Sequence, residues 1–329
     1  MIDCRIPERV MLGNWPTPLQ EMPRLALALG GPRLFIKRDD ETGCALSGNK
    51  IRELEFLFAE ALAAKADVII TCGRQDSNHV RLTTAAANKL GLRTVLVLDG
   101  GQAPPEPKGN LLLDMVLGAE LHFIPSADWA NADRHMEDIA AACRRKGQKP
   151  YIVPKGAACP MGSIGYALAV KEMAAQAVQL GANIKSIVVS SGTGGTQAGV
   201  VVGCRVWWPQ VKVIGCSVGP DPAILAPTIA RLARGAAQSM GVATEIKDED
   251  IILHGEFVGA GYGALTDDAR QAIREFARYE GVILDPIYTA KGAAGLLALI
   301  RSKGLDPGDI VFLHTGGVPA LFSVGAAVL

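Results

Sequence analysis

Short apolar runs alternate with helical patterns along almost the whole chain, and this alternation limits the possible folds more than any other feature. A first series lies between residues 67 and 153. Its expected strands are Asp67–Thr71, Thr94–Leu98, Glu120–Ile124 and Tyr151–Val153, and its expected helices are 77–90, 110–117 and 127–145. Strands joined through helices pair in parallel, so the pattern predicts an α/β fold with helices on both faces of a parallel sheet.

A second series of the same kind occupies the rest of the chain. Its expected strands are Ile187–Ser190, Val211–Val218, Ile283–Leu284 and Ile310–Leu313, with helices near 165–180, 195–206, 223–238, 266–279 and 292–301. The early segment Arg33–Arg38 is expected to join this second sheet, which makes the first series an insertion. At 329 residues the chain is long for one core. We therefore expect a large domain of residues 1–46 plus 160–329 and a smaller inserted α/β domain of residues 47–159.

Two turns rich in small residues lie where the active sites of such folds are found, beyond the carboxyl ends of parallel strands. Lys50 follows one of them, Ser47-Gly48-Asn49, and opens an amphipathic helix, although an amine there is usually a solvated surface residue. The other, Ser190–Thr196, follows an expected strand; it fits a phosphate cradle or simply a tight turn. Together, an amine and a phosphate cradle suggest pyridoxal phosphate held as a Schiff base to Lys50.

A third polar cluster, Ser77-Asn78-His79, lies between an expected strand and an expected helix. Ser77 or Asp76 can simply cap that helix, and His79 can be a satisfied helix histidine. The cluster is nevertheless more polar than capping requires. Its N–H groups can hold a substrate carboxylate, and its side chains can reach a cofactor.

Later loops supply further candidates. Tyr262 and Tyr288 stand on loops marked by glycine or proline, where a buried structural phenol is the competing interpretation. Thr315 follows an apolar strand, where its hydroxyl can face a pyridine nitrogen. Lys291 is a second amine, but it lacks the glycine-asparagine approach of Lys50, and we expect it on the surface.

The composition excludes several classes of function. The net charge is zero, from 33 basic and 33 acidic residues, which predicts neither a nucleic-acid nor an acidic-membrane partner. No apolar run is long enough to span a bilayer, and the first five residues show no signal-peptide pattern. The seven cysteines have no CxxC spacing, so we expect free thiols in a reducing, cytoplasmic compartment. The five histidines are not paired at ligand spacing, so no metal site is expected.

Taken together, these segments resemble the pyridoxal-phosphate enzymes of the tryptophan-synthase β-like fold, fold type II. The closest resemblance is to the group of D-cysteine desulfhydrases and 1-aminocyclopropane-1-carboxylate (ACC) deaminases. The matching segments cover nearly the whole chain: Thr17–Leu19, Ile36–Asp40, Gly48–Lys50, Ser77–His79, Ser191–Thr196, Asp285–Thr289 and His314–Gly317. The resemblance implies two three-layer parallel-sheet domains, a pyridoxal phosphate cofactor, a small amino-acid substrate and a homodimer.

The resemblance also implies roles for single residues. Lys50 would carry the cofactor and move the substrate α-proton. Asn78 would bond the cofactor's 3′-oxygen, and Ser77 would bind the substrate carboxylate or assist proton transfer. Ser77, Asn78 and His79 are all expected to bind the substrate. The phosphate would lie in the turn made by Gly192, Thr193, Gly194, Gly195 and Thr196.

Around the ring, the resemblance places Tyr288 against the cofactor, Tyr262 near the substrate, and Thr289 and Thr315 near the pyridine nitrogen. The ACC deaminases of this group carry a glutamate where Thr289 stands. A carboxylate there keeps the nitrogen protonated and strengthens the electron sink, whereas a neutral threonine suits the loss of a good leaving group. The expected reaction is therefore α,β-elimination on D-cysteine, giving pyruvate, sulfide and ammonia.

Four residues depart from the group's pattern. Glu53 stands where a basic residue usually helps with the phosphate, and Ser47 replaces a common glycine. Arg74 and Asp76 replace small or amide residues beside the carboxylate site. Arg74 would suit a sulfonate, as in L-cysteate, and Asp76 a second ammonium, as in diaminopropionate, unless the two pair with each other or cap the helix.

Other functions remain open from the sequence. ACC deamination is the nearest alternative, and serine racemisation or dehydration can start from the same carbanion. A pyridoxal-binding protein without turnover is the non-enzyme alternative. A flavin or nicotinamide oxidoreductase is a distant one.

Overall fold

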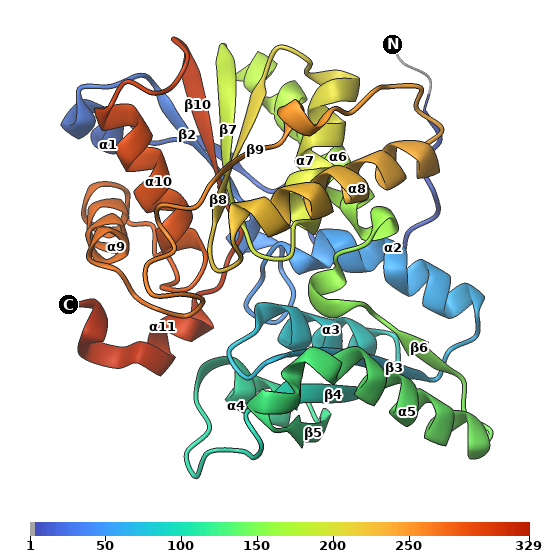
Figure 1. The fold of residues 1–329 in the computed structure, drawn as a ribbon. Helices are drawn as coiled ribbons and strands as arrows, with labels where there is room; N and C mark the ends of the chain where they lie inside the picture. The colour runs from blue at the N-terminus through green and yellow to red at the C-terminus, as the bar shows by residue number, and fades with distance from the viewer. Residues whose placement is uncertain (1–3) are drawn as a thin grey trace.

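A computed structural model describes residues 4–329, which form two parallel β-sheets flanked by helices (Figure 1). The larger sheet has the strand order β1-β2-β10-β7-β8-β9, and only β1 runs antiparallel. Its strands are β1 (Leu19–Glu21), β2 (Leu34–Arg38), β7 (Ile184–Ser191), β8 (Lys212–Ser217), β9 (Ile252–His254) and β10 (Asp309–His314). The smaller sheet, β5-β4-β3-β6, is parallel throughout. Its strands are β3 (Val68–Arg74), β4 (Arg93–Asp99), β5 (Glu120–Ile124) and β6 (Pro150–Ile152).

Helices cover both faces of each sheet, because the inward sides of both layers are apolar. On the larger sheet, α6 (Pro160–Gln179), α7 (Gly195–Trp207) and α8 (Pro222–Ser239) cover one face, and α1 (Pro23–Leu29), α9 (Asp267–Glu280) and α10 (Thr289–Arg301) cover the other. On the smaller sheet, α5 (Ala132–Arg145) lies on one face, and α3 (Asn78–Lys89) and α4 (Gly109–Val116) lie on the other. None of the helices within residues 4–329 is long and apolar enough to cross a bilayer.

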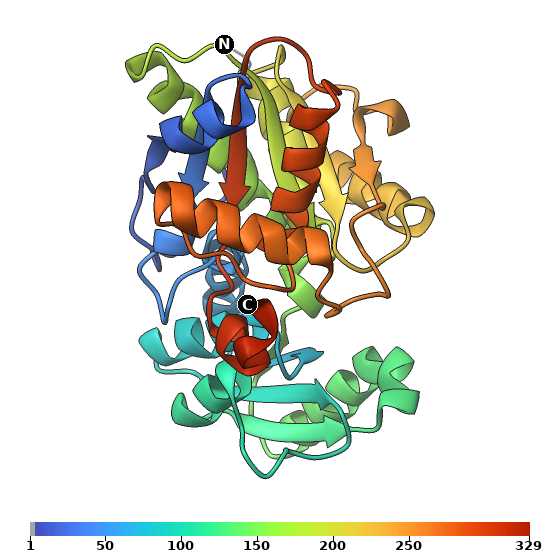
Figure 2. The ribbon, with the colours of Figure 1, turned by 90° about the vertical axis from the view of Figure 1, so that its left-hand side faces the viewer.

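Helix α2 (Lys50–Ala63) lies between the two sheets and packs against both α6 and α3. The contact with α6 is close enough to require glycine, because a Cβ on Gly165 would stand 2.2 Å from the Arg52 carbonyl oxygen. The C-terminal helix α11 (Pro319–Val324) also bridges the sheets, since it packs against α4 (Figure 2). Segments from both ends of the chain therefore hold the two sheets together.

The α/β class and the parallel two-sheet arrangement predicted from the sequence are confirmed. β2 pairs in parallel with β10, which confirms that the early extended segment joins the second sheet. The expected strand Ile283–Leu284 is wrong: these residues connect α9 to α10, and Leu284 fills the core without strand pairing. The three-residue strands β1 and β9 were not expected. The domain limits, 1–46 plus 160–329 and 47–159, stay a prediction. Residues 1–3 belong to the expected large domain and to the segment that was expected to show no signal-peptide pattern, but they lie outside the described residues.

Candidate active site

A cavity of about 500 Å³ lies beyond the carboxyl ends of strands from both sheets. Twelve of the residues singled out from the sequence line it: Lys50, Arg74, Ser77, Asn78, His79, Gly192, Thr193, Gly194, Thr196, Tyr262, Tyr288 and Thr315. Asp76, Gly195 and Thr289 do not line it, although Gly195 lies within the Gly192–Thr196 turn. The topology explains this meeting, because the carboxyl ends of parallel strands share one edge of each sheet.

Lys50 is the first residue of α2, and its side chain is 12% exposed at the cavity wall. Its ammonium donates to a carboxylate oxygen of Glu53 at 2.7 Å and to the carbonyl oxygen of Gly156 at 2.8 Å. Glu53 is fully buried, and its other oxygen accepts from the Thr196 hydroxyl at 2.8 Å. Burial raises the pKa of Glu53. The acid that departs from the group's pattern thus links the Lys50 ammonium to the glycine turn.

The turn before Lys50 is strained. Ala45, Leu46 and Ser47 all have φ between 38° and 62°, a left-handed conformation that costs a non-glycine residue free energy. Arg81 from α3 holds this turn by donating to the carbonyl oxygens of Ala45 and Ser47. The turn is closed on its other side by the Asn49 N–H, which donates to the carbonyl oxygen of Thr315 at 3.0 Å.

Arg81 was missed in the sequence, because an arginine on a helix normally reads as solvent-facing. In the structure it is fully buried, and burial lowers its pKa to about 10. Its position four residues after Ser77, on the helix that the polar cluster opens, was the available signal.

The glycine turn has the shape of an anion cradle. β7 ends at Ser191, Gly194 takes the left-handed φ of 89°, and α7 begins at Gly195. The first N–H groups of a helix have no partner within it and carry the positive end of the helix dipole. The opposite wall comes close, because a Cβ on Gly156 would stand 2.4 Å from the Thr193 hydroxyl.

The Ser77–His79 cluster combines capping with cavity lining. The Ser77 hydroxyl caps α3 by accepting from the His79 N–H at 3.2 Å, as the simpler interpretation predicted. His79 is also satisfied: its Nε2 bonds the Thr71 hydroxyl at 2.8 Å, and burial lowers its pKa to about 3. Thr71 donates its own proton to the Val153 carbonyl, so we assign the Nε2–H tautomer to His79.

Two phenols meet at the cavity. The Tyr262 hydroxyl donates to Asp76 at 3.2 Å and bonds the Tyr288 hydroxyl, and the rings are edge to face at 5.8 Å. Burial raises the pKa of both phenols and of Asp76. Both tyrosines are therefore protonated near neutral pH and can donate hydrogen bonds or protons.

Arg74 and Asp76 reach Tyr262 separately. The Arg74 guanidinium stacks 5.1 Å from the centre of the Tyr262 ring and pairs with Asp99 at 3.3 Å, with 49% of its side chain exposed. Asp76 accepts from the Tyr262 hydroxyl instead. Arg74 lines the cavity, whereas Asp76 does not.

Thr289 and Lys291 begin α10 without lining the cavity. The Thr289 hydroxyl donates to Asp285 at 2.6 Å, and Asp285 also accepts from three backbone N–H groups at the helix start. The expected surface position of Lys291 is wrong. Its side chain is fully buried, because three backbone carbonyl groups surround its ammonium.

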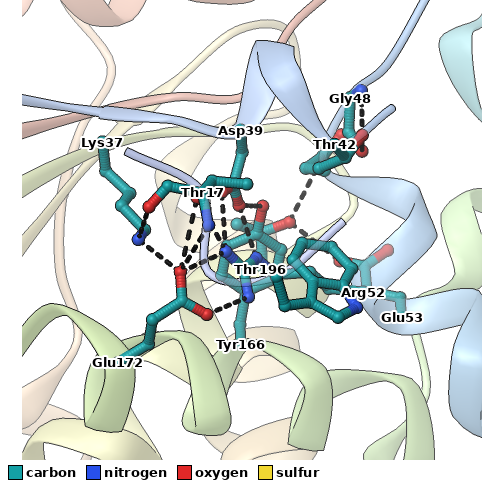
Figure 3. Close-up of polar contacts among 12 residues, drawn as sticks. Thr17, Lys37, Asp39, Thr42, Gly48, Arg52, Glu53, Tyr166, Glu172 and Thr196 are labelled. Atoms are coloured by element: carbon teal, nitrogen blue, oxygen red, sulfur yellow. Dashed lines mark hydrogen bonds and ion pairs between the residues drawn. The ribbon is translucent and has the colours of Figure 1, made fainter. Parts of the chain in front are cut away.

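A buried ionic network supports α2 behind Lys50 (Figure 3). Arg52 donates to both oxygens of Asp39 at 2.8 Å and to both oxygens of Glu172 at 3.1 Å. Tyr166 donates to Asp39 at 2.6 Å, and Lys37 pairs with Glu172. Burial opposes the ionisation of Asp39, but Arg52 outweighs it and lowers the pKa of Asp39. The network ties α2 to β2 and α6.

Sequence reasoning also missed Trp129 and Lys155 on the cavity wall. The Lys155 ammonium lies 5.2 Å from the centre of the Trp129 ring. Lys155 directly precedes Gly156, and this glycine was the available signal for it. Trp129 has no such neighbour, and only the fold brings it to the cavity.

A family model described as pyridoxal-phosphate dependent enzyme matches residues 10–316. A Pyrococcus horikoshii protein, provisionally named 1-aminocyclopropane-1-carboxylate deaminase, is 40% identical over 98% of this chain and 95% of its own. D-cysteine desulfhydrase from Klebsiella pneumoniae is 38% identical over 97% of this chain and 96% of its own. Among solved structures, an ACC deaminase homologue gives a TM-score of 0.90 at 39% identity, covering 98% of this chain and 95% of that one.

Proposed function

This chain belongs to the pyridoxal-phosphate dependent enzymes, within the group of ACC deaminases and D-cysteine desulfhydrases, and from that premise we propose that it eliminates the β-substituent of D-cysteine. The products would be pyruvate, hydrogen sulfide and ammonia, with one water consumed. Membership of the family makes this chain a pyridoxal-phosphate dependent lyase. The choice of D-cysteine is the proposal.

The residues of the cavity fit the family's cofactor. Lys50 offers the amine, and the turn Gly192–Thr196 at the start of α7 offers a phosphate cradle that glycines keep open. Tyr288 and Thr315 line the space between them. When bound, pyridoxal phosphate withdraws electrons from the α-carbon of an amino acid.

The remaining chemistry is assigned to the chain's own residues. Lys50 would take the substrate α-proton, held in place by the Gly156 carbonyl and Glu53. The start of α3, at Ser77 and Asn78, would bind the substrate carboxylate. Tyr288 and Tyr262 would donate a proton to the departing sulfur, because burial keeps both phenols protonated.

One observation carries the choice of leaving group: within residues 4–329, no carboxylate is among the residues lining the cavity. A pyridine nitrogen in such surroundings has no acid to keep it protonated, and the electron sink is weaker. A thiolate leaves readily without a strong sink, whereas opening a cyclopropane ring needs one. Of the two threonines expected near the pyridine nitrogen, Thr315 lines the cavity, whereas Thr289 does not and is bonded to Asp285.

ACC deamination is a second candidate, favoured by the relatives that carry that name. Among the sequence-based alternatives, Arg74 on the cavity wall favours an anionic β-substituent, such as the sulfonate of L-cysteate. Diaminopropionate has less support, because Asp76 is bonded to Tyr262 and does not line the cavity.

The test is a side-by-side product assay on the purified protein loaded with pyridoxal phosphate. We expect pyruvate and sulfide from D-cysteine at a higher kcat/KM than product from ACC, L-cysteate, diaminopropionate or serine. Faster formation of 2-oxobutanoate from ACC would replace the D-cysteine proposal by ACC deamination. A yellow protein that turns over no member of the panel would instead be a binding protein. A homodimer and a cytoplasmic location stay predictions.

A further inference from the structure

We propose that Lys291 acts as a built-in monovalent cation that fixes the loop carrying Tyr262, which makes it a positioning residue. The role of Tyr262 in the reaction rests on the proposed function. The cation site itself does not, because it is defined by contacts among buried groups.

The Lys291 ammonium is enclosed by backbone oxygens. It donates to the carbonyl oxygens of Val218 at 3.1 Å, Val258 at 2.8 Å and Gly261 at 2.8 Å. An ammonium has three N–H donors, so all of them are used. Throughout residues 4–329, no carboxylate lies within ion-pair distance of this ammonium. Three converging carbonyl groups with a central charge are the surroundings that proteins give to potassium ions.

The three carbonyl groups come from two segments that are separate in the sequence. Val218 follows β8, whereas Val258 and Gly261 belong to the loop between β9 and α9. This loop has little conformational preference of its own, since Gly259 and Gly261 have φ of 69° and 140°. Carbonyl dipoles that point at a common centre repel one another unless a cation lies between them. The charge of Lys291 therefore holds the loop against β8.

The loop in turn places the phenol. Tyr262 directly follows Gly261, and a Cβ on Gly219 would stand 2.9 Å from the Tyr262 Cβ, so the backbones approach closely here. Tyr288 stands at the start of the helix that carries Lys291. Helix α10 thus positions Tyr288, which stands at its start, and through Lys291 it also positions the loop that carries Tyr262.

The test compares K291A with K291M in the cofactor-loaded enzyme. K291A removes the ammonium and leaves a space beside the carbonyl groups, whereas K291M keeps the side-chain volume and removes only the charge. Chymotrypsin cleavage after Phe257 and Tyr262 reports opening of the loop. In tetramethylammonium chloride, both variants should be cut about tenfold faster than wild type, which corresponds to about 1.4 kcal/mol in the opening equilibrium.

Small cations should separate the two variants. Ammonium, methylammonium or potassium should slow the cleavage of K291A toward the wild-type rate and raise its kcat, because they can enter the vacated space. K291M should respond to none of them. Cleavage of K291M at the wild-type rate, or of K291A at a rate that no cation changes, would overturn the proposal. If K291A does not fold, the K291M cleavage rate still decides.

Two controls keep the outcomes distinct. Lys146→Ala, at an exposed lysine, should behave as wild type in every salt. The visible absorbance of bound cofactor should persist in all variants, since Lys50 is untouched. If the D-cysteine assignment is wrong, the substrate panel on wild type fails while the cleavage pattern stands. If the cation assignment is wrong, the expected cleavage pattern fails while the substrate panel on wild type still succeeds.

Discussion

Lys50 and Lys291 begin two different helices of one molecule, yet their surroundings are opposite. Lys50 faces a cavity, with one carboxylate and one carbonyl group as partners. Lys291 is enclosed by three carbonyl groups and is not among the residues that line this cavity. A nucleophilic amine needs a free side and partners that can release it. Access and the type of partner, rather than the presence of a lysine near a helix start, therefore distinguish an amine suited to chemistry from one suited to structural support.

Both positions oppose the helix dipole, which disfavours cations at a helix N-terminus. Lys50 is compensated by the carboxyl group of Glu53, a side chain that can change its charge or move. Lys291 is compensated by backbone carbonyl groups, which can do neither. Burial lowers the pKa of Lys291, and the charge of Asp285 acts in the opposite direction.

The largest expected effect is the loss of turnover when Lys50 is replaced. K50A should lower turnover by about 10³-fold or more, because the base and the covalent attachment are both lost. Borohydride reduction of the wild-type holoenzyme, followed by peptide mass spectrometry, should find the cofactor on Lys50. A label on Lys291 would reverse the roles assigned to the two lysines.

The buried ionic network behind Lys50 should contribute more to stability than an exposed ion pair does. D39A should lower the free energy of unfolding by about 3–5 kcal/mol, because it leaves Arg52 buried without one of its carboxylates. The matched control is D306A, whose partner Lys212 is exposed; its cost should stay below about 1 kcal/mol. Urea unfolding measures both, and equal losses would show that the network behind Lys50 is not what holds α2.

Replacing Glu53 by glutamine tests how the partner of Lys50 contributes to stability at different pH values. Burial raises the pKa of Glu53 in the folded protein above that in the unfolded chain. Protonation of Glu53 therefore stabilises the folded protein at low pH, and this stabilisation is lost as the pH rises through the raised pKa. Thermal unfolding should therefore show wild type losing stability relative to E53Q from acidic to neutral pH.

The same substitution removes a negative charge next to the phosphate turn. At neutral pH, E53Q should bind pyridoxal phosphate about tenfold more tightly, or about 1.4 kcal/mol. Titration of cofactor absorbance measures this, with the exposed Glu245→Gln as the control. Unchanged affinity would place the charge of Glu53 out of reach of the phosphate.

Arg74 is an intermediate case, since it is a half-exposed cation that already has Asp99 as a partner. R74A should raise the KM for L-cysteate about fivefold, a modest effect because an ion pair between the sulfonate and a half-exposed guanidinium contributes little. The KM for D-cysteine should stay nearly unchanged, because its thiol carries no such anion. R74K should restore only part of the difference, since lysine lacks the guanidinium fork. Equal effects on both substrates would remove Arg74 from substrate selection.

The sequence allowed the fold class and most of the cavity to be predicted, because those depend on local signals. Lys50 and the Gly192–Thr196 turn are marked by glycines next to a strand or helix end. Lys291 was misjudged because its partners, Val218, Val258 and Gly261, are backbone groups that any residue type could supply. Arg81 and the Asp285–Thr289 contact were likewise hidden, since they depend on loops whose shape no periodic pattern encodes.

The bond between the Asn49 N–H and the Thr315 carbonyl has a consequence for how the protein is made. Lys50 emerges from the ribosome early, but the turn that orients it cannot close until β10 and Thr315 have also been synthesised. A nascent chain therefore displays an amine without a finished site. Loading with cofactor becomes a late event, which follows assembly of the two sheets rather than guiding it.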